Sequence, residues 1–163
     1  MELRILPECY ANTALTTVLG FRKANHKEGV GNILKALDSP GYNNSIGIAL
    51  IDKDKQAPNR LKEDYQFYKR IGSLEIRRMG QSKRFVIIHP IFEKWTYDEG
   101  LIHNISTGEF GLPNDYSAYK DVCKRQDASV NFHLKAYLNS LLQIDSEIKE
   151  LKQIIDQLIK EFP

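Results

Sequence analysis

The chain has 163 residues, of which 42% are hydrophobic and 27% are charged. This length and composition predict one compact domain with an appended element, and they exclude an intrinsically disordered chain. The 23 basic and 21 acidic residues leave a formal net charge of +2, so the overall charge does not indicate a nucleic-acid-binding protein. Two cysteines exclude a disulfide framework. We expect neither a signal peptide nor a membrane span, and hence a soluble protein of the reducing cytoplasm.

Short apolar runs alternate with helix-like segments along the first part of the chain, residues 1–96. Strands are predicted at 3–6 and 45–51, and the second run is apolar almost throughout, which is typical of a parallel strand covered on both faces. Between them, residues 29–37 carry apolar side chains at the i, i+3, i+4, i+7 spacing of a helix. This alternation predicts an α/β domain with a compact, mostly parallel, Rossmann-like sheet flanked by helices.

Further along the chain, an aromatic-rich helix is predicted at 61–68, and strands follow at 74–76 and 85–88 around a polar turn at 80–82. Residues 97–130 are polar and are punctuated by glycine and proline, so we expect a loop-rich connecting segment there, either a functional loop region or short helices without a clear pattern. The predicted organisation is therefore an α/β domain, this connecting segment and a C-terminal element.

Residues 131–163 are predicted to form one long amphipathic helix. Apolar side chains recur from Leu134 to Phe162 with a period of about 3.5 residues, and no glycine or proline interrupts them before Pro163. Such a seam favours a coiled-coil homodimer through the 134–162 helix. The alternative is that the same face packs against the chain's own body.

Acidic residues follow two of the predicted strands. Glu8 comes after the first strand, and Asp52 and Asp54 follow the buried strand at 45–51. If these strands are parallel neighbours, their carboxyl ends share one edge of the sheet, where α/β proteins bind ligands. Carboxylate oxygens are the ligands that Mg²⁺ or Mn²⁺ prefers, and a cation would relieve the repulsion between close acids. The alternative is that Asp52 caps a loop and Asp54 is a solvated surface residue.

Two other classes of protein use the Asp-x-Asp pattern. Haloacid-dehalogenase-type phosphatases require Thr or Val two residues after the second aspartate, where this chain has Gln56. Metal-dependent glycosyltransferases normally need a larger nucleotide-binding domain than this chain supplies. Both classes fit the sequence less well than a metal-dependent phosphodiester-transfer site does.

Three segments in this order resemble the Toprim domain, which occurs in topoisomerases, primases, OLD-family nucleases and small RloB-like proteins linked to bacterial defence. The segments are 6–15 (LPECYANTAL), 48–54 (IALIDKD) and 89–95 (HPIFEKW). The resemblance covers residues 2–95. It implies a Toprim-like fold and nuclease activity, with a role in phage defence and an ATPase supplied by a separate partner protein.

The resemblance also implies roles for individual side chains. Glu8 would perform general acid/base chemistry, and Asp52 and Asp54 would hold Mg²⁺ or Mn²⁺, with Glu8 as a further ligand. Lys83 resembles a lysine that OLD-type nucleases place near the phosphate, where it would neutralise charge that develops in the transition state.

The stretch 53–84 carries ten Lys and Arg residues against four Asp and Glu residues, in a nearly neutral chain. Local positive surface of this kind is what nucleic-acid backbones require. The polar turn at 80–82 predicts a basic hairpin tip beside the acidic edge, and the alternative is an ordinary solvated hairpin. The candidate phosphate-binding residues that flank this turn are Arg77, Arg78, Lys83 and Arg84.

Three further residues are candidates for the site. His26 and Lys27 precede the helix predicted at 29–37, and backbone amides at a helix start favour phosphate binding. The alternative is an ordinary helix start. Glu93 is a candidate additional acid, or else it anchors its own loop.

These features together favour a Mg²⁺- or Mn²⁺-dependent nuclease, or another phosphodiester-transfer protein that acts on DNA or RNA. The alternative is a catalytically inactive Toprim-like interaction module that dimerises through its C-terminal helix. Carboxylate-dependent binding of the divalent cation separates the two hypotheses.

Overall fold

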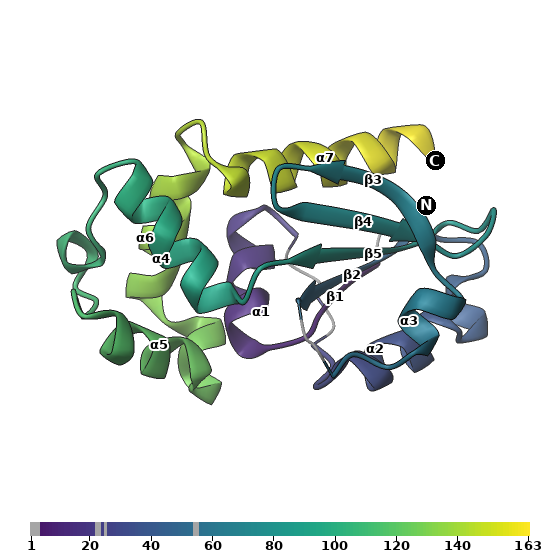
Figure 1. Ribbon diagram of the computed structural model, residues 1–163, viewed down its shortest axis with the longest axis horizontal. Coiled ribbons are helices and arrows are strands. Elements are labelled where there is room, and N and C mark those ends of the chain that lie inside the picture. The colour runs from purple at the N-terminus through teal and green to yellow at the C-terminus, as the bar shows by residue number, and fades with distance from the viewer. Residues whose placement is uncertain (1–3, 22–23, 25, 54–55) are drawn as a thin grey trace.

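The structure is a computed structural model, which describes residues 4–21, 24, 26–53 and 56–163. At its centre lies a five-stranded mixed sheet (Figure 1). Its strands are β1 (Arg4–Pro7), β2 (Gly47–Asp52), β3 (Gln66–Ile71), β4 (Leu74–Arg78) and β5 (Arg84–His89). Their order along the sheet is β1-β2-β5-β4-β3. The neighbours β1, β2 and β5 are parallel, whereas β4 and β3 are added antiparallel. The α/β fold is thus confirmed, but the sheet has a parallel half and an antiparallel half that meet at β5.

Helices surround this sheet (Figure 1). Those in the described part of the chain are α1 (Tyr10–Val18), α2 (Val30–Leu37), α3 (Arg60–Glu63), α4 (Phe92–Ile102), α5 (Tyr116–Lys124), α6 (Phe132–Leu142) and α7 (Glu147–Glu161). Within that part of the chain, no helix combines the length and the apolar character that crossing a bilayer requires.

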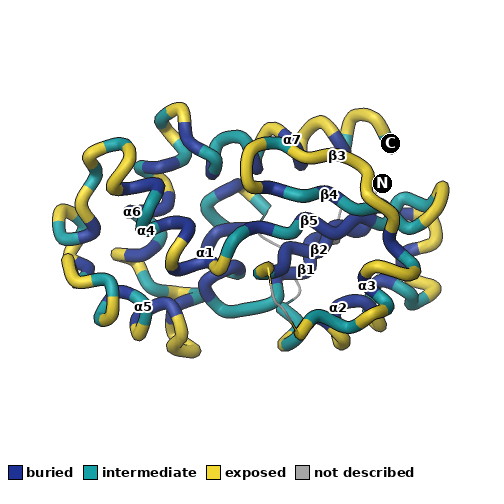
Figure 2. The backbone as a smooth tube through the Cα atoms, viewed as in Figure 1, coloured by how far each residue is buried: buried dark blue, intermediate teal, exposed yellow. Residues whose placement is uncertain are grey.

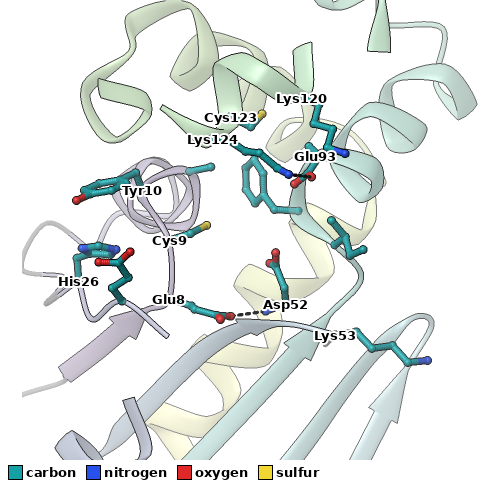
Figure 3. A pocket seen from close by; sticks show the side chains of 14 residues that line it. Glu8, Cys9, Tyr10, His26, Asp52, Lys53, Glu93, Lys120, Cys123 and Lys124 are labelled. Atoms are coloured by element: carbon teal, nitrogen blue, oxygen red, sulfur yellow. Dashed lines mark hydrogen bonds and ion pairs between the residues drawn. The ribbon is translucent and has the colours of Figure 1, made fainter. Parts of the chain in front are cut away.

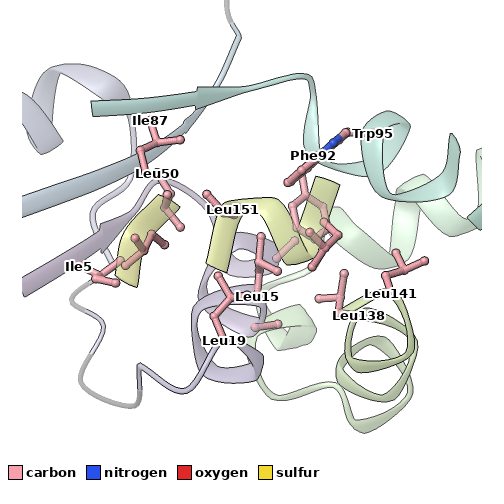
Figure 4. Close-up of a cluster of buried hydrophobic side chains, with 14 of the residues drawn as sticks. Ile5, Leu15, Leu19, Leu50, Ile87, Phe92, Trp95, Leu138, Leu141 and Leu151 are labelled. Atoms are coloured by element: carbon pink, nitrogen blue, oxygen red, sulfur yellow. The ribbon is translucent and has the colours of Figure 1, made fainter. Parts of the chain in front are cut away.

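Each face of the parallel half packs on its own set of helices. On one face, Leu6 and Ala49 are buried against α2 and α3. On the other face, Ile5 and Leu50 join a cluster with side chains of α1, α4, α6 and α7 (Figure 4). Since β2 lies between two parallel neighbours and is covered on both faces, its sequence is apolar without alternation.

The antiparallel half is covered differently. Leu74 and Ile76 of β4 are buried on the face that α7 covers. Residues of the edge strand β3 are mostly exposed, as the yellow tube in Figure 2 shows. One side of this half therefore belongs to the core, and polar side chains occupy the other side.

The helix predicted at 61–68 is wrong. Helix α3 ends at Glu63, and β3 occupies the positions from Gln66 onward. The pairing of β3 with β4 shifts register between Phe67 and Lys69. An exposed edge strand with such an irregularity carries no clean alternation of apolar and polar residues, so the sequence did not indicate a strand.

The segment at 97–130 is helical rather than a loop region, so the alternative of short helices is confirmed. It holds the end of α4, all of α5, and two 3₁₀ segments at Thr107–Phe110 and Gln126–Val130. Together with α6, these helices form a group beyond the carboxyl end of β5, which its arrowhead marks in Figure 1.

The single C-terminal helix expected at 131–163 is two helices. Helix α6 ends at Leu142, and the Ser146 hydroxyl starts α7 by accepting a hydrogen bond from the Lys149 N–H at 3.3 Å. Seam residues such as Leu141 and Leu151 are fully buried in the chain's own core. The alternative interpretation, packing against the body, is confirmed, and this seam is not available for a coiled coil in this conformation.

Candidate active site

Because β1, β2 and β5 are parallel, their carboxyl ends lie together along one edge of the sheet, at the ends of the strands. Between this edge and the helices α1, α4 and α5 lies a cavity of about 590 Å³ (Figure 3). Its volume falls within the range of ligand-binding clefts, about 300–1,000 Å³. Its charged and thiol-bearing lining residues are Glu8, Cys9, His26, Glu28, Asp52, Lys53, Glu93, Lys120, Cys123 and Lys124.

Glu8 and Asp52 are in direct contact at this edge. The Glu8 Oε2 atom accepts a hydrogen bond from the backbone N–H of Asp52 at 3.0 Å, drawn as a dashed line in Figure 3. The Glu8 N–H in turn donates to the Leu50 carbonyl at 3.1 Å, which continues the β1–β2 pairing by one residue. The prediction that these two acids converge is confirmed, although they are 44 residues apart in the sequence.

Strand alternation orients Asp52 and its neighbour Lys53 in opposite directions. Asp52 pairs in register with His89, on the face that carries Leu50. Lys53 follows with its backbone N–H donating to the His89 carbonyl at 2.7 Å. In Figure 3 its ammonium group points away from Asp52, as expected from the sequence.

His89 lies fully buried beneath Asp52. Its Nδ1 atom is 2.6 Å from the Pro90 carbonyl oxygen, which can only accept, so Nδ1 carries the proton. The same atom is 3.5 Å from the Asp52 Oδ1 atom, and the ring stacks on Trp95 with centroids 4.9 Å apart. Burial lowers the pKa of His89 to about 4, so the imidazole is neutral near pH 7. The neutral ring therefore lies enclosed against Asp52, with its Nδ1 proton directed at the Pro90 carbonyl.

Glu93 and two lysines form the opposite wall of the cavity. Glu93 lies in the first turn of α4, and its side chain is only 9% exposed. The Lys124 Nζ atom is 3.9 Å from Glu93 Oε1, and Lys120 lies one turn earlier on α5 (Figure 3). The cavity therefore combines carboxylates with ammonium groups, and Glu93 belongs to it, as predicted.

Two thiols also line the cavity, and neither is a nucleophile. Burial, followed by the negative charge of Asp52, raises the pKa of Cys9 to about 12. Burial likewise raises the pKa of Cys123 to about 12. Since the thiolate is the reactive form, both side chains are inert near neutral pH.

Glu8 and Asp52 could supply some, but not all, of the ligands of a divalent cation. Among residues 4–21, 24, 26–53 and 56–163, no three Asp, Glu, His or Cys side chains are grouped closely enough to hold a metal ion by themselves. Mg²⁺ typically takes one or two carboxylates and completes its octahedron with water and phosphate oxygens. Glu8 and Asp52 fit that mode, whereas the predicted ligand Asp54 lies outside the described residues.

The segment with His26 and Lys27 lies at the same edge. The Lys27 N–H donates to the Pro7 carbonyl at 3.1 Å, beside the end of β1. The His26 ring packs on Tyr10 with centroids 4.4 Å apart and lines the cavity (Figure 3). The structure thus brings this predicted phosphate-binding segment close to the acids.

The basic hairpin tip lies at the opposite end of the strands from Glu8 and Asp52, so the prediction that it adjoins the acids is wrong. The Lys83 carbonyl accepts from the N–H of Gly47, the first residue of β2, and the Lys83 Nζ contacts the Pro163 carbonyl oxygen. Arg84 donates to Asn43 at 2.6 Å, and Arg78 lies over the Phe162 ring at 4.4 Å. Because β5 runs parallel to β2, the residues before it lie a strand length, roughly 17 Å, from the acids.

Arg77 differs from these three residues. Its guanidinium donates to the Tyr65 carbonyl at 3.0 Å and to Glu75 Oε1 at 2.6 Å. It projects from the antiparallel half of the sheet and does not line the cavity that holds Glu8. Only His26, Lys27 and Glu93 among the predicted auxiliary residues therefore lie at the edge that holds Glu8 and Asp52.

Lys120 and Lys124 were missed by sequence reasoning because no individual helix was predicted within 97–130. A signal for a helix was present: Tyr119, Val122 and Cys123 have the i, i+3, i+4 spacing and form its buried face. Asp115 also caps the helix, its side chain accepting from the Ala118 N–H at 3.0 Å.

Comparisons of the chain with protein-family models, with curated proteins and with solved structures give no significant match. The function therefore has to be argued from the chemistry of the cavity.

Proposed function

We propose that the chain is a Mg²⁺- or Mn²⁺-dependent nuclease, or a related phosphodiester-transfer protein of Toprim-like type, acting in the cytoplasm. The observation that carries the proposal is the contact between Glu8 and Asp52 at the carboxyl edge of two parallel strands. This contact lies in a cavity whose other charged side chains include three lysines, Lys53, Lys120 and Lys124. Carboxylates suit a hard cation, and ammonium groups suit phosphate oxygens.

Hydrolysis of a phosphodiester forms a bond from a water oxygen to phosphorus and breaks the bond to the leaving oxygen. Glu8 is the candidate base that takes the proton of the attacking water, and the Asp52 N–H fixes the orientation of its carboxylate. Asp52 is the principal cation ligand, and Asp54 is a further candidate ligand. A bound divalent cation would supply an activated water and would stabilise the charge on the leaving oxygen.

Lys120 and Lys124 take over the phosphate-binding role that was predicted for Lys83. Lys120 and Lys124 project from α5 into the cavity opposite Asp52 (Figure 3). In that position they would hold the non-bridging oxygens of a phosphate that approaches the acids. Glu93 contacts Lys124 and would keep its ammonium group directed into the cavity.

Cleavage of labelled DNA and RNA in Mg²⁺ or Mn²⁺ tests this proposal, with Asp52→Asn and Glu8→Gln as the site variants. Asp145→Asn, an exposed residue in the turn before α7, is the matched control. We expect the site variants to lose at least about 100-fold in cleavage rate, the magnitude typical of a lost acid–base group. The control should retain full activity.

Calorimetric titration with Mn²⁺ separates this function from a catalytically inactive interaction module. The wild-type chain should bind the cation, and Asp52→Asn should bind it far more weakly. Residual cleavage in Asp52→Asn equal to that of the wild type, or no carboxylate-dependent binding of Mn²⁺, would exclude the proposed chemistry.

A further inference from the structure

A second groove lies on the face of the sheet opposite the acids. Its volume is about 350 Å³, and it lies between α3 and the uncovered side of the antiparallel half. Lys53 lines both this groove and the carboxylate cavity. The two hollows therefore adjoin at the residue that directly follows Asp52.

The walls of the groove are strongly basic. Lys53, Lys62, Arg70 and Arg77 line it, and among the lining residues that the structure describes Glu75 is the one acid. Cross-strand register explains the grouping, because Arg70 pairs with Glu75 on the same face of the β3–β4 hairpin. The chain as a whole is nearly neutral, so this concentration of positive charge is local.

Glu75 organises the two arginines and does not cancel the groove's charge. Its carboxylate accepts from Arg70 Nη2 at 2.5 Å and from Arg77 Nε at 2.6 Å. Arg77 is further fixed by its hydrogen bond to the Tyr65 carbonyl at 3.0 Å. Two guanidinium groups are thus held in place by one carboxylate, and fixed guanidinium groups bind phosphate oxygens well.

The rest of the described lining is uncharged. Ala57, Leu61 and Ile88 form an apolar floor, and Asn59 and Ser73 add polar groups. An unpaired nucleotide suits such a lining, because its base face can cover apolar surface while its phosphate meets the cations. A duplex stacks its base faces on one another and would leave the apolar surface uncovered.

We propose that this groove binds the backbone and an unpaired base of a single nucleic-acid strand and leads that strand past Lys53 to the carboxylate cavity. This inference deepens the proposed nuclease function and rests on it, since it assigns the substrate as single-stranded nucleic acid. Its occupant follows from charge complementarity, the apolar floor and the shared lining residue Lys53.

Fluorescence anisotropy with a short labelled oligothymidylate in EDTA tests the groove without requiring a metal or catalysis. The variants are Lys62→Glu and Arg70→Gln, and the matched control is Lys160→Glu, an exposed lysine on α7 outside the groove. We expect each groove variant to bind about 3- to 10-fold more weakly. The slope of log K against log salt should fall by about 0.7 for each lost phosphate contact. The control should match the wild type.

Two results would overturn the groove assignment: equal affinity of Lys62→Glu and Lys160→Glu, or equal affinity of the wild type for the single strand and its duplex. A different result would show that the nuclease proposal fails while the groove assignment holds. The groove variants would still bind the single strand more weakly than the wild type in EDTA, but the wild type would cleave no substrate in Mn²⁺. If cleavage occurs but the groove variants bind and cleave like the wild type, only the groove assignment fails.

Discussion

The parallel and antiparallel halves of the sheet share β5 but are built for different surroundings. In the parallel half, helices cover both faces, and polar groups appear only where strands end. In the antiparallel half, α7 covers one face, and the other face carries Arg70, Glu75 and Arg77. Charged side chains therefore lie at the strand ends of the parallel half and on the uncovered face of the antiparallel half.

This difference explains how a small chain holds two adjoining polar regions. A strand buried on both faces can place a charged side chain only at or just beyond its carboxyl end, where Asp52 and Glu8 lie. A hairpin covered on one face can present alternate residues to solvent along its whole length. Lys53 belongs to both regions because it follows β2 on the side opposite Asp52.

Truncation of one large apolar residue in each half should show the contrast most strongly. Leu50 of β2 is fully buried, whereas Phe67 of β3 is 59% exposed. Leu50→Ala should lower the free energy of unfolding by about 2–5 kcal/mol, and Phe67→Ala by less than about 1 kcal/mol. Urea unfolding followed by circular dichroism measures both. Similar losses in the two variants would mean that the halves do not differ in burial as described.

His89, at the end of the shared strand, should make stability depend on pH. Its pKa is lowered to about 4 in the fold, from 6.5 for an ordinary histidine. Between these values the unfolded chain binds more protons, so the free energy of unfolding falls as pH falls from about 6.5 to about 4. The full change is about 3 kcal/mol at most.

Urea unfolding in EDTA across that pH range measures this effect, with His89→Gln as the comparison. Carboxylates also titrate there, so the informative quantity is the difference in slope between the two proteins. If the wild type and His89→Gln lose stability in parallel, the buried histidine is not the cause.

The parallel half was the more predictable from the sequence. The unbroken apolar run that ends at Asp52 indicated a central parallel strand, and this position in turn placed Glu8 beside it. The strands predicted at 74–76 and 85–88 around a polar turn are β4 and β5. Apolar spacing likewise gave α2, whose buried residues Val30, Ile33, Leu34 and Leu37 face the sheet.

The remaining elements could not be predicted because their signals depend on tertiary neighbours. Strand β3 is an exposed edge whose aromatic residues suggested a helix. The placement of Lys83 required the direction of β5 relative to β2, which periodicity does not contain. The break before α7 had a local signal, Ser146 followed by Glu147 and Glu150, but the apolar seam continued across it and suggested one helix.

A hydrogen bond between α4 and α7 ties the two halves together and gives the third prediction. The Trp95 Nε1–H donates to Glu147 Oε2 at 2.7 Å, and Glu147 also accepts from the Ser73 N–H in the β3–β4 turn at 2.8 Å. Trp95→Phe retains a ring that can stack on His89 but removes the donor. It should cost about 1.5–3 kcal/mol of stability, as expected for a hydrogen bond to a charged group.

A double-mutant cycle with Glu147→Ala isolates this contact, because each single variant removes one partner of the Trp95–Glu147 hydrogen bond. Additive losses would show that the bond contributes nothing and that β5 and the shared apolar core join the halves. A coupling energy of about 1 kcal/mol or more would establish the tie between them.

The start of α7 gives the smallest effect, because only one capping side chain is changed there. The Ser146 hydroxyl accepts from the Lys149 N–H at 3.3 Å and donates to the Leu141 carbonyl at 2.5 Å. Ser146→Ala removes both bonds and should cost about 1 kcal/mol in urea unfolding, whereas Ser117→Ala, exposed on α5, should change stability by less than about 0.5 kcal/mol. Amide exchange should become faster in the first turn of α7 and in β4 beneath it, but remain unchanged in β2. Faster exchange throughout β2 would instead show that the two halves unfold as one unit, which would contradict a separate dependence of the antiparallel half on α7.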